Sequence, residues 1–311
     1  MGPSRVFVTR SEGHEHGVRS VLRLAEGALQ GVAGRDVVIK VNFVSAHVEL
    51  CATPVEAVRA LLEALSRHRA EAVLIAESPS GGTLREALRN YGYYALREEF
   101  DVEFFDLAED DYEVLEVWDR SLERRVRVRV SRTILESEYL VSVVRPKTHD
   151  TVVVTLTIKN VAVGAILPPD RGLIHQGPRA INLSIAYIAA HMMPKLAVVD
   201  GYVGMEGDGP VSGDPRPMGL AVAGTDAVAV DSTTALLMGF DPCSVGYLYY
   251  LWRWGYGCMA PNEVTIEGLT DWRRHVVRFR PHSTYARQLA WRLSPEEYEK
   301  ALRGLELPRR A

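Results

Sequence analysis

The stretch VVIKVNFVSAHVELCATPVEAVRALLEALSRHRAEAVLIAE (residues 37–77) carries the clearest fold signal in the sequence. Val37–Val41 is an apolar, β-branched run typical of a buried strand. Thr53-Pro54-Val55-Glu56 predicts a capping box with proline at the first helical position, and a helix after it. Ala72–Ala76 is a second buried strand. A strand, a helix and a strand in this order form a βαβ unit with parallel strands.

The same alternation continues on both sides of this stretch. We expect further strands at Val6–Thr9, Val102–Phe105, Val114–Trp118, Val126–Val130, Tyr139–Val144, Val152–Ile158, Leu196–Val199 and Met218–Ala223. We expect further helices at Arg19–Gln30, Thr83–Asn90, Ala180–His191, Ala227–Met238 and after a capping box at Ser294-Pro295-Glu296-Glu297. Val114–Trp118 and Val126–Val130 are expected to pair as a hairpin. The predicted fold class is α/β, with a mainly parallel sheet built from βαβ units.

An internal repeat is suggested by two similar motifs. Ile39-Lys40-Val41-Asn42 resembles Ile158-Lys159-Asn160, and in both cases a helix and an apolar strand ending in an acid follow. We therefore predict two similar α/β halves around a cleft, at residues 1–125 and 126–280, and a C-terminal helical tail at 281–311. The alternative is one continuous α/β domain over residues 1–280.

Composition narrows the class of function. The 311 residues carry a net charge of −4 and a pI of about 6.2, which argues against a nucleic-acid partner. No uncharged apolar run reaches the roughly 18 residues that a membrane span needs, and no apolar leader follows Met1, so we expect a cytoplasmic protein without membrane contact. The segments Arg287–Ala311 and Tyr247–Tyr256 are candidate contacts of a homodimer.

Lysine is rare in this chain. The basic residues divide into 31 arginines and 5 lysines, a ratio typical of a GC-rich genome and of a thermophilic source. Lys40, Lys147 and Lys159 each lie at or beside the end of a predicted strand. Because ligands of parallel α/β sheets bind beyond the carboxyl ends of the strands, we expect these three lysines to line one cleft. Lysine also differs from arginine in having an amine that can lose its proton.

Two histidines accompany these lysines. Arg145-Pro146-Lys147-Thr148-His149 follows a predicted strand and combines cations with an imidazole, a set suited to anion binding or proton transfer. His175 lies in a loop before a predicted helix. We predict Lys147, His149, Lys159 and His175 as catalytic residues. Structural ion pairs are the alternative for the motif lysines, with Asp200 or another acid as the partner of Lys159, and the same alternative holds for Lys40.

Other residues are candidates for binding a cofactor or a metal ion. The amides of Asn42 and Asn160 and the glycine-containing loop Ser78-Pro79-Ser80-Gly81-Gly82, whose backbone N–H groups could hold a phosphate or carboxylate, are predicted to bind a cofactor together with Lys40. The glycine-rich segment 200–210 supplies Asp200 and Glu206, which we expect to bind a divalent metal with His149 and His175. Turn formation is the alternative explanation of this segment.

These motifs, taken together, resemble the domain of unknown function 362 family. The matching motifs are Lys40-Val41-Asn42-Phe43, Ala52-Thr53-Pro54, Glu77-Ser78-Pro79, Lys147-Thr148-His149, Thr155-Leu156-Thr157-Ile158-Lys159-Asn160, Asp200-Gly201, Glu206-Gly207-Asp208-Gly209-Pro210, Ala229-Val230-Asp231 and Met238-Gly239-Phe240-Asp241-Pro242. The activity of that family is unsettled. Some members carry iron–sulfur segments, which implies a redox partner protein. Cys51, Cys243 and Cys258 are widely spaced, so we expect no such cluster on this chain alone.

The arrangement is also distantly similar to the catalytic domain of nickel-pincer lactate racemases, which hold a nickel-bearing nucleotide and abstract an α-proton. By role, His149, His175 and Lys159 would correspond to their site residues. The acid of a diagnostic Asp-x-x-Arg loop is missing, because Asn42 and Phe43 stand where it would be expected.

Three functions follow from the sequence. The first is an enzyme acting on a small carboxylate- or phosphate-bearing molecule at a cleft lined by lysine and histidine, with racemase-like proton abstraction as one form of it. The second is a non-catalytic metal or cofactor carrier that serves a redox system. The third is a structural or interaction protein in which the motifs maintain the fold.

Overall fold

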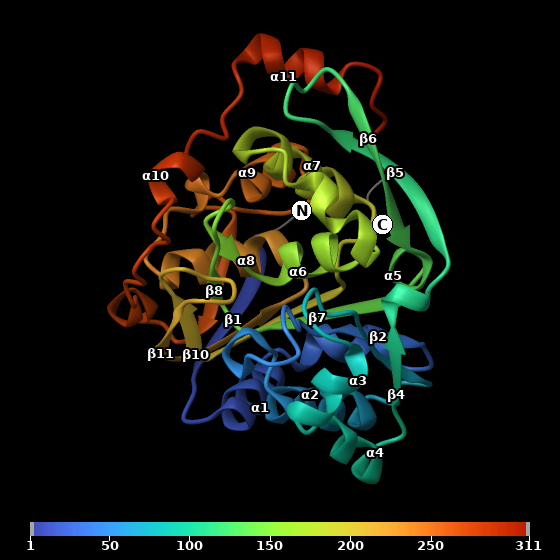
Figure 1. The fold of residues 1–311 in the computed structure, drawn as a ribbon. Helices are drawn as coiled ribbons and strands as arrows, with labels where there is room; N and C mark the ends of the chain where they lie inside the picture. Colours follow the sequence, from blue (N-terminus) through green and yellow to red (C-terminus); the bar gives the residue numbers. More distant parts are fainter. Residues whose placement is uncertain (1–2, 309–311) are drawn as a thin grey trace.

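The structure, a computed structural model, describes residues 3–308. Its centre is a mixed β-sheet between two layers of helices (Figure 1). Within the described residues ten strands form this sheet, eight of them in the order β12-β1-β11-β10-β7-β2-β3-β4, while β8 pairs with β10 and β9. The strands are β1 (Ser4–Arg10), β2 (Val37–Lys40), β3 (Val73–Glu77), β4 (Glu103–Asp106), β7 (Tyr139–Val144), β8 (Lys147–Thr148), β9 (Val154–Thr155), β10 (Leu196–Glu206), β11 (Asp214–Gly224) and β12 (Val264–Gly268).

The run β10-β7-β2-β3-β4 is parallel throughout, and β1 pairs in parallel with β12. Within this sheet, the described strands pair antiparallel at β1–β11, β10–β11 and β8–β9. The predicted α/β class with a mainly parallel sheet is therefore confirmed. One sheet contains strands from both sides of residue 125, and the proposed domain boundary at that position stays a prediction.

Helices cover both faces of the sheet (Figure 1). One face is covered by α1 (His14–Leu24), α2 (Val55–Arg67), α3 (Leu84–Asn90) and α4 (Leu96–Glu99), and the other by α6 (Thr157–Gly164), α7 (Pro178–Ala190), α8 (Ala227–Leu237) and α9 (Gly246–Arg253). Successive residues of β2 point to opposite faces. Val37 and Ile39 pack with the α1–α2 layer, whereas Val38 packs with the α6–α8 layer. Burial on both faces explains why these strands are continuous apolar runs.

Short 3₁₀ helices occupy many of the connections. They are η1 (Glu26–Val32), η2 (Glu49–Cys51), η3 (Tyr93–Ala95), η4 (Leu107–Glu109), η5 (Pro168–Ile174), η6 (Pro242–Ser244) and η7 (Trp272–His275). The structure divides the predicted helix at Arg19–Gln30 into two elements: α1 ends at Leu24, and η1 follows it.

The predicted hairpin is confirmed as β5 (Tyr112–Trp118) paired with β6 (Arg125–Ser131), and the short helix α5 (Arg132–Leu135) follows it. The C-terminal segment holds α10 (Tyr285–Gln288) and α11 (Pro295–Leu302), the latter opened by the predicted capping box at Ser294. This segment packs on the hairpin, since the buried Trp118 indole donates to the Ala301 carbonyl at 2.9 Å. Residues 309–311 of the predicted tail lie outside the described residues.

The predicted strand at Val152–Ile158 is wrong. Only Val154–Thr155 is extended and paired, and helix α6 begins at Thr157. The cause is Asp231 of α8, whose carboxylate accepts hydrogen bonds from the backbone N–H groups of Thr157 and Ile158 at 3.0 and 2.9 Å. Such acceptors satisfy the free N–H groups of a helix start. Lys159 therefore lies in the first turn of a helix, and its proposed equivalence to the strand residue Lys40 fails.

Two further local predictions are corrected. Strand β10 continues to Glu206, so most of the expected acidic loop is strand paired with β11. Thr53 does not cap helix α2; its hydroxyl accepts from the Asn42 N–H and donates to the Val143 carbonyl, both at 2.9 Å. No helix in the described range 3–308 is long and apolar enough to cross a membrane.

Candidate functional site

A cavity of about 160 Å³ lies where strands β2 and β3 end and helix α6 begins. Its walls are formed by Asn42, Phe43, Val44, Glu77, Ser80, His149, Asp150, Thr155, Lys159, Asn160, Val163, Gly164, Arg171, His175 and Pro210. Of the predicted site residues, the cavity brings together Asn42, His149, Lys159, Asn160 and His175. Its position beyond the carboxyl ends of parallel strands is the usual position of ligand sites in α/β sheets.

Lys40 is fully buried behind this cavity and is not in its wall. Its ammonium donates to Glu77 Oε2 at 2.7 Å and to the Val41 carbonyl at 2.8 Å. The same carboxylate oxygen accepts the Phe43 N–H at 2.8 Å, and Glu77 Oε1 accepts the Ser78 N–H. Lys40 is thus the partner of a buried carboxylate, which is the structural ion pair expected from the sequence as its alternative role.

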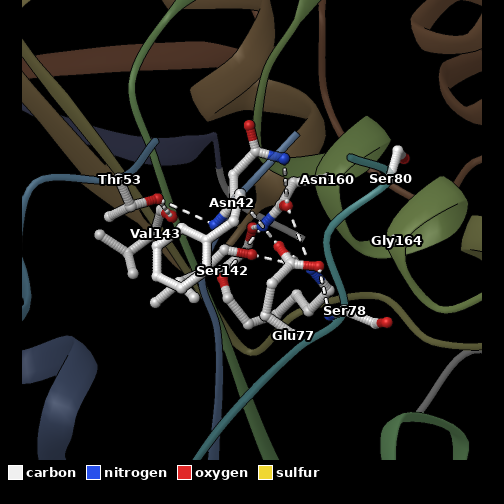
Figure 2. A network of polar contacts seen from close by, with 12 residues as sticks. Asn42, Thr53, Glu77, Ser78, Ser80, Ser142, Val143, Asn160 and Gly164 are labelled. Atoms are coloured by element: carbon white, nitrogen blue, oxygen red, sulfur yellow. Dashed lines mark hydrogen bonds and ion pairs between the residues drawn. The ribbon is translucent and has the colours of Figure 1, made fainter. Parts of the chain in front are cut away.

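Asn42 and Asn160 contact each other in the polar network of Figure 2, and each also contacts a buried lysine. Lys147, fully buried in β8, donates to Asn42 Oδ1 and to the Cys51 carbonyl. Because the oxygen of Asn42 is held by Lys147, its Nδ2 donates to Asn160 Oδ1, at 3.0 Å. Lys40 Nζ lies 3.5 Å from that same Asn160 oxygen. An amide nitrogen has two hydrogens, so Asn42 keeps one N–H for a ligand in the cavity.

Lys147 is therefore a positioning residue for Asn42. Burial lowers its pKa to about 7. It does not line the cavity, in contrast to its predicted catalytic role.

Lys159 is the lysine that faces the cavity. Its side chain is 8% exposed, and its ammonium makes no hydrogen bond or ion pair with any residue of the described chain. Burial lowers its pKa to about 8, and the nearby Asp150 carboxylate opposes that shift. The structural ion pair with Asp200 or another acid that the sequence left open is absent from residues 3–308.

The two histidines present different nitrogen atoms. His149 is buried, and its Nδ1 lies 3.0 Å from Asp150 Oδ1 and accepts the Thr151 N–H, also at 3.0 Å; because that hydrogen bond needs a lone pair on Nδ1, we assign the proton of the neutral ring to Nε2. The His175 Nδ1 lies 3.0 Å from the Arg171 carbonyl, which requires a proton on Nδ1 and leaves Nε2 as an acceptor. Burial lowers the pKa of both rings below the usual 6.5. At neutral pH the cavity thus has one ring that donates and one that accepts.

Arg171 is a cavity residue that the sequence predictions missed. Its buried guanidinium donates to the carbonyls of Ile166 at 2.8 Å and Gly164 at 3.0 Å, and to that of Ser78. It therefore joins the end of helix α6 to the loop after β3. The sequence feature that could have identified Arg171 is its position four residues before His175, in the same loop.

Three N–H groups of the loop after β3, which the sequence predicted to be free, already have protein acceptors. The Ser78 N–H donates to Glu77, and those of Ser80 and Gly81 donate to the Val44 carbonyl at 3.2 and 3.1 Å. Gly82 adopts a φ of 89°, and a Cβ there would lie 2.7 Å from that of Ala46, so this glycine is required by the turn. Of this loop only Ser80 reaches the cavity wall.

Asp200 and Glu206, the predicted metal ligands, lie outside the cavity wall. Asp200 Oδ2 lies 2.6 Å from His14 Nδ1, and Glu206 accepts the Arg280 N–H at 2.9 Å. In the part of the chain that is described, no three histidine, cysteine, aspartate or glutamate side chains are grouped to hold a metal ion. The residues do not fit the predicted metal centre, because its two carboxylates bind other groups away from His149 and His175.

The polar groups that remain available in the cavity are mainly hydrogen-bond donors. The Lys159 ammonium, the second Asn42 N–H and His149 Nε2 can donate, whereas both oxygens of Glu77 already accept from other groups. Lys159 and Arg171 are cationic, Glu77 is neutralised by Lys40, and Asp150 is half exposed at the edge. This excess of hydrogen-bond donors and positive charge in the cavity favours a negatively charged ligand.

Residues 37–235, more than half of the chain, match the family model described as a domain of unknown function, DUF362. The chain belongs to the DUF362 family. The resemblance seen in the sequence motifs is thereby confirmed. All residues of the cavity wall lie inside the matched range, so the cavity is a feature of the DUF362 domain.

A thylakoid-associated protein of Synechocystis is 23% identical over 252 residues, which are 77% of this chain and 76% of that protein. The lactate racemase apoprotein of Thermoanaerobacterium thermosaccharolyticum is similar in structure, with a TM-score of 0.49 and 14% identity, over 72% of this chain and 54% of that one. A Thermotoga maritima protein has a TM-score of 0.45 and 11% identity, over 79% and 60% of the two chains. The chain thus spans little more than half of either solved protein.

Proposed function

We propose that this DUF362 protein is an enzyme that binds a small carboxylate- or phosphate-bearing molecule in the cavity and moves a proton on it. The observation that carries this proposal is Lys159, a buried residue of the cavity wall whose ammonium has no hydrogen bond or ion pair within residues 3–308. Burial disfavours the charged ammonium more than the nearby Asp150 carboxylate favours it, and an anionic ligand would offset that penalty.

The histidines supply the proton transfer. His175 Nε2 has a free lone pair and acts as the general base, while the proton on His149 Nε2 is donated to the substrate. Both rings are neutral at pH 7, because burial holds their pKa values below 6.5. Asn42 adds an N–H whose direction is fixed by Lys147.

The cavity volume limits the substrate. About 160 Å³ corresponds to roughly five water molecules, which is less than the space that drug-sized ligands occupy. We therefore propose that the cavity encloses the anionic group of the substrate and a few neighbouring non-hydrogen atoms.

The test is a set of small carboxylates and phosphate esters incubated with the protein in D₂O and followed by NMR. Turnover, or deuterium at the carbon beside the anionic group, is the expected result; deuterium exchange would identify the racemase-like form of the activity. His175→Gln should keep binding and lose turnover, whereas Lys159→Met should lose both. A wild-type protein that binds none of these anions would overturn the proposal, and so would a His175→Gln variant with full turnover.

The metal or cofactor carrier remains the alternative from the sequence, and bound metal or nucleotide without turnover in protein from its own host would favour it. A cytoplasmic location, a homodimer and a redox partner protein are further proposals, which fractionation and size measurements of the protein from its host would test.

A further inference from the structure

The side-chain amide of Gln288 is buried against the loop that carries His149. Gln288 ends helix α10 in the C-terminal segment and is 1% exposed. Its Oε1 accepts the Val153 N–H at 2.7 Å, and its Nε2 donates to the His149 carbonyl at 2.7 Å and to the Thr284 hydroxyl at 2.8 Å. Both amide hydrogens and the amide oxygen are therefore used, and two of the three bonds go to this loop.

These bonds complete the hairpin of β8 and β9. Beyond the pair Thr148–Val154, His149 lies opposite Val153, and the His149 N–H donates to the Val153 carbonyl at 3.0 Å. In a regular antiparallel pair of this kind the second N–H bonds back directly to the first carbonyl. Here the Gln288 amide stands between the two groups, since it accepts from the Val153 N–H and donates to the His149 carbonyl. The end of the hairpin is thus closed by a side chain 135 residues further along the chain than Val153.

The backbone of Val153 shows why the loop needs this support. Its φ is 70°, in the left-handed region that β-branched residues rarely adopt, and the Val154 N–H donates to the Val152 carbonyl across it at 2.9 Å. This is the hydrogen bond of a γ-turn, which is strained when φ is positive. A strained backbone persists only where its surroundings hold it. The Val153 side chain is buried and its N–H is bound by Gln288, so both contacts fix the turn.

The loop held in this way forms part of the cavity wall. His149 and Asp150 both line the cavity, and the Thr151 N–H donates to His149 Nδ1 at 3.0 Å within the same loop. The Thr284 hydroxyl donates to the Asp150 carbonyl at 2.6 Å, as Gln288 does to that of His149. The C-terminal segment therefore binds the backbone carbonyls of both wall residues.

We propose that Gln288 is a positioning residue, which holds the His149 ring in the orientation needed to donate a proton to the substrate. This inference rests on the proposed function, in which His149 Nε2 supplies that proton. Gln288 lies outside the cavity wall, so it acts through the backbone of the loop. The conformation of the loop places the Thr151 N–H on Nδ1, which leaves the ring proton on Nε2.

The test follows the tautomer of the His149 ring, which a loss of stability alone would not change. Gln288→Met keeps the size of the side chain and removes its three hydrogen bonds, and Thr284→Val removes the bond to the Asp150 carbonyl. Ser294→Ala is the matched control, because it removes the cap of helix α11 in the same C-terminal segment. The ring nitrogens are observed at pH 7 by long-range proton–nitrogen NMR and are assigned by the loss of their signals in His149→Gln. The unfolding midpoint of each protein is measured as well.

Wild type and Ser294→Ala should both show one tautomer with Nδ1 unprotonated, although the control should unfold a few degrees lower. Gln288→Met should show a mixture of the two tautomers. The reason is that the Thr151 N–H no longer stays on Nδ1, while the Asp150 carboxylate, 3.0 Å from Nδ1, favours a proton there. Thr284→Val should change the spectrum in the same direction by a smaller amount, and it decides the question if Gln288→Met does not fold.

Catalysis provides a second measurement. With a substrate that wild type turns over in D₂O, Gln288→Met should lower kcat by about tenfold or more, because a general acid that is out of position contributes less. KM should stay within about threefold of wild type, since Lys159 and Asn42 bind the anion from other segments.

Two results would overturn the inference. The first is an unchanged His149 spectrum in folded Gln288→Met, or in Thr284→Val if Gln288→Met does not fold. The second is full kcat in a variant whose His149 tautomer has changed. A wild-type protein without turnover would instead overturn the proposed function, and because the tautomer comparison needs no substrate, it would still show whether Gln288 orients the ring.

Discussion

Asp231 and Thr157 are 74 residues apart, yet the Asp231 carboxylate accepts both the Thr157 N–H, at 3.0 Å, and its hydroxyl, at 2.6 Å. This contact, with the bond from Ile158, fixes the start of helix α6 two residues before Lys159. The position of the cavity lysine is thus set by a residue on another helix, α8.

Replacement of Asp231 by alanine should therefore destabilise the fold strongly. Three buried hydrogen bonds to one carboxylate are lost, for which we expect a decrease of about 3–5 kcal/mol in the free energy of unfolding, measured by urea denaturation. Asp241→Ala is the control, because it removes an exposed cap of the short helix η6 and should cost about 1 kcal/mol. Equal losses in the free energy of unfolding would show that the Asp231 carboxylate stabilises the fold no more than an exposed helix cap does.

The buried pair of Lys40 and Glu77 gives a second prediction. Lys40→Met leaves the Glu77 carboxylate buried without its cation, which should lower the free energy of unfolding by about 3–5 kcal/mol. Adding Glu77→Gln should recover a large part of this loss, since no uncompensated charge then remains. Urea denaturation of the two single variants and the double variant forms the thermodynamic cycle. Additive losses would mean that the two groups do not stabilise each other.

The sequence predicted the sheet well because its strands are buried on both faces and are continuous apolar runs, as in β2 and β7. It failed at Val152–Ile158, where an apolar run of strand length is ambiguous between strand and helix. The determining contact there comes from Asp231, which no local pattern relates to Thr157.

The site was predicted in part for a similar reason. Polar residues that follow strands indicated Asn42 and His149, and both line the cavity. The local pattern could not show that Lys40 is paired with Glu77 or that Asp200 is bound to His14, because those partners are 37 and 186 residues away. Arg171 was not predicted, because the chain has 31 arginines and residue type alone does not separate one of them from the others.

The buried Lys147 predicts an unusual pH dependence of stability. Its pKa is lowered to about 7 in the folded protein, against about 10.4 when unfolded. Between these values the unfolded chain binds one more proton, so stability increases as pH rises, by up to about 1.4 kcal/mol per pH unit. Wild type should therefore gain about 2 kcal/mol more than Lys147→Met between pH 7.5 and 9.5 in urea denaturation. The same gain in both proteins would exclude a depressed pKa at Lys147.

Lys159 predicts how anion binding depends on pH. Its pKa is lowered to about 8 by burial, and only the protonated ammonium attracts an anion, so the contribution of Lys159 to phosphate affinity should fall about twofold from pH 7 to 8 and approach a tenfold loss per unit above pH 8. His149 and His175 do not titrate in this range, because their pKa values lie below 6.5.

The Lys159→Arg variant keeps its positive charge at every pH tested. The larger guanidinium should weaken phosphate binding at pH 7, but the affinity of this variant should not fall between pH 8 and 10. Lys195→Arg is the control for lysine replacement outside the cavity and should retain the wild-type profile. Calorimetric titration with phosphate checks each curve. A decline of the Lys159→Arg affinity parallel to that of wild type would show that another group controls the anion site.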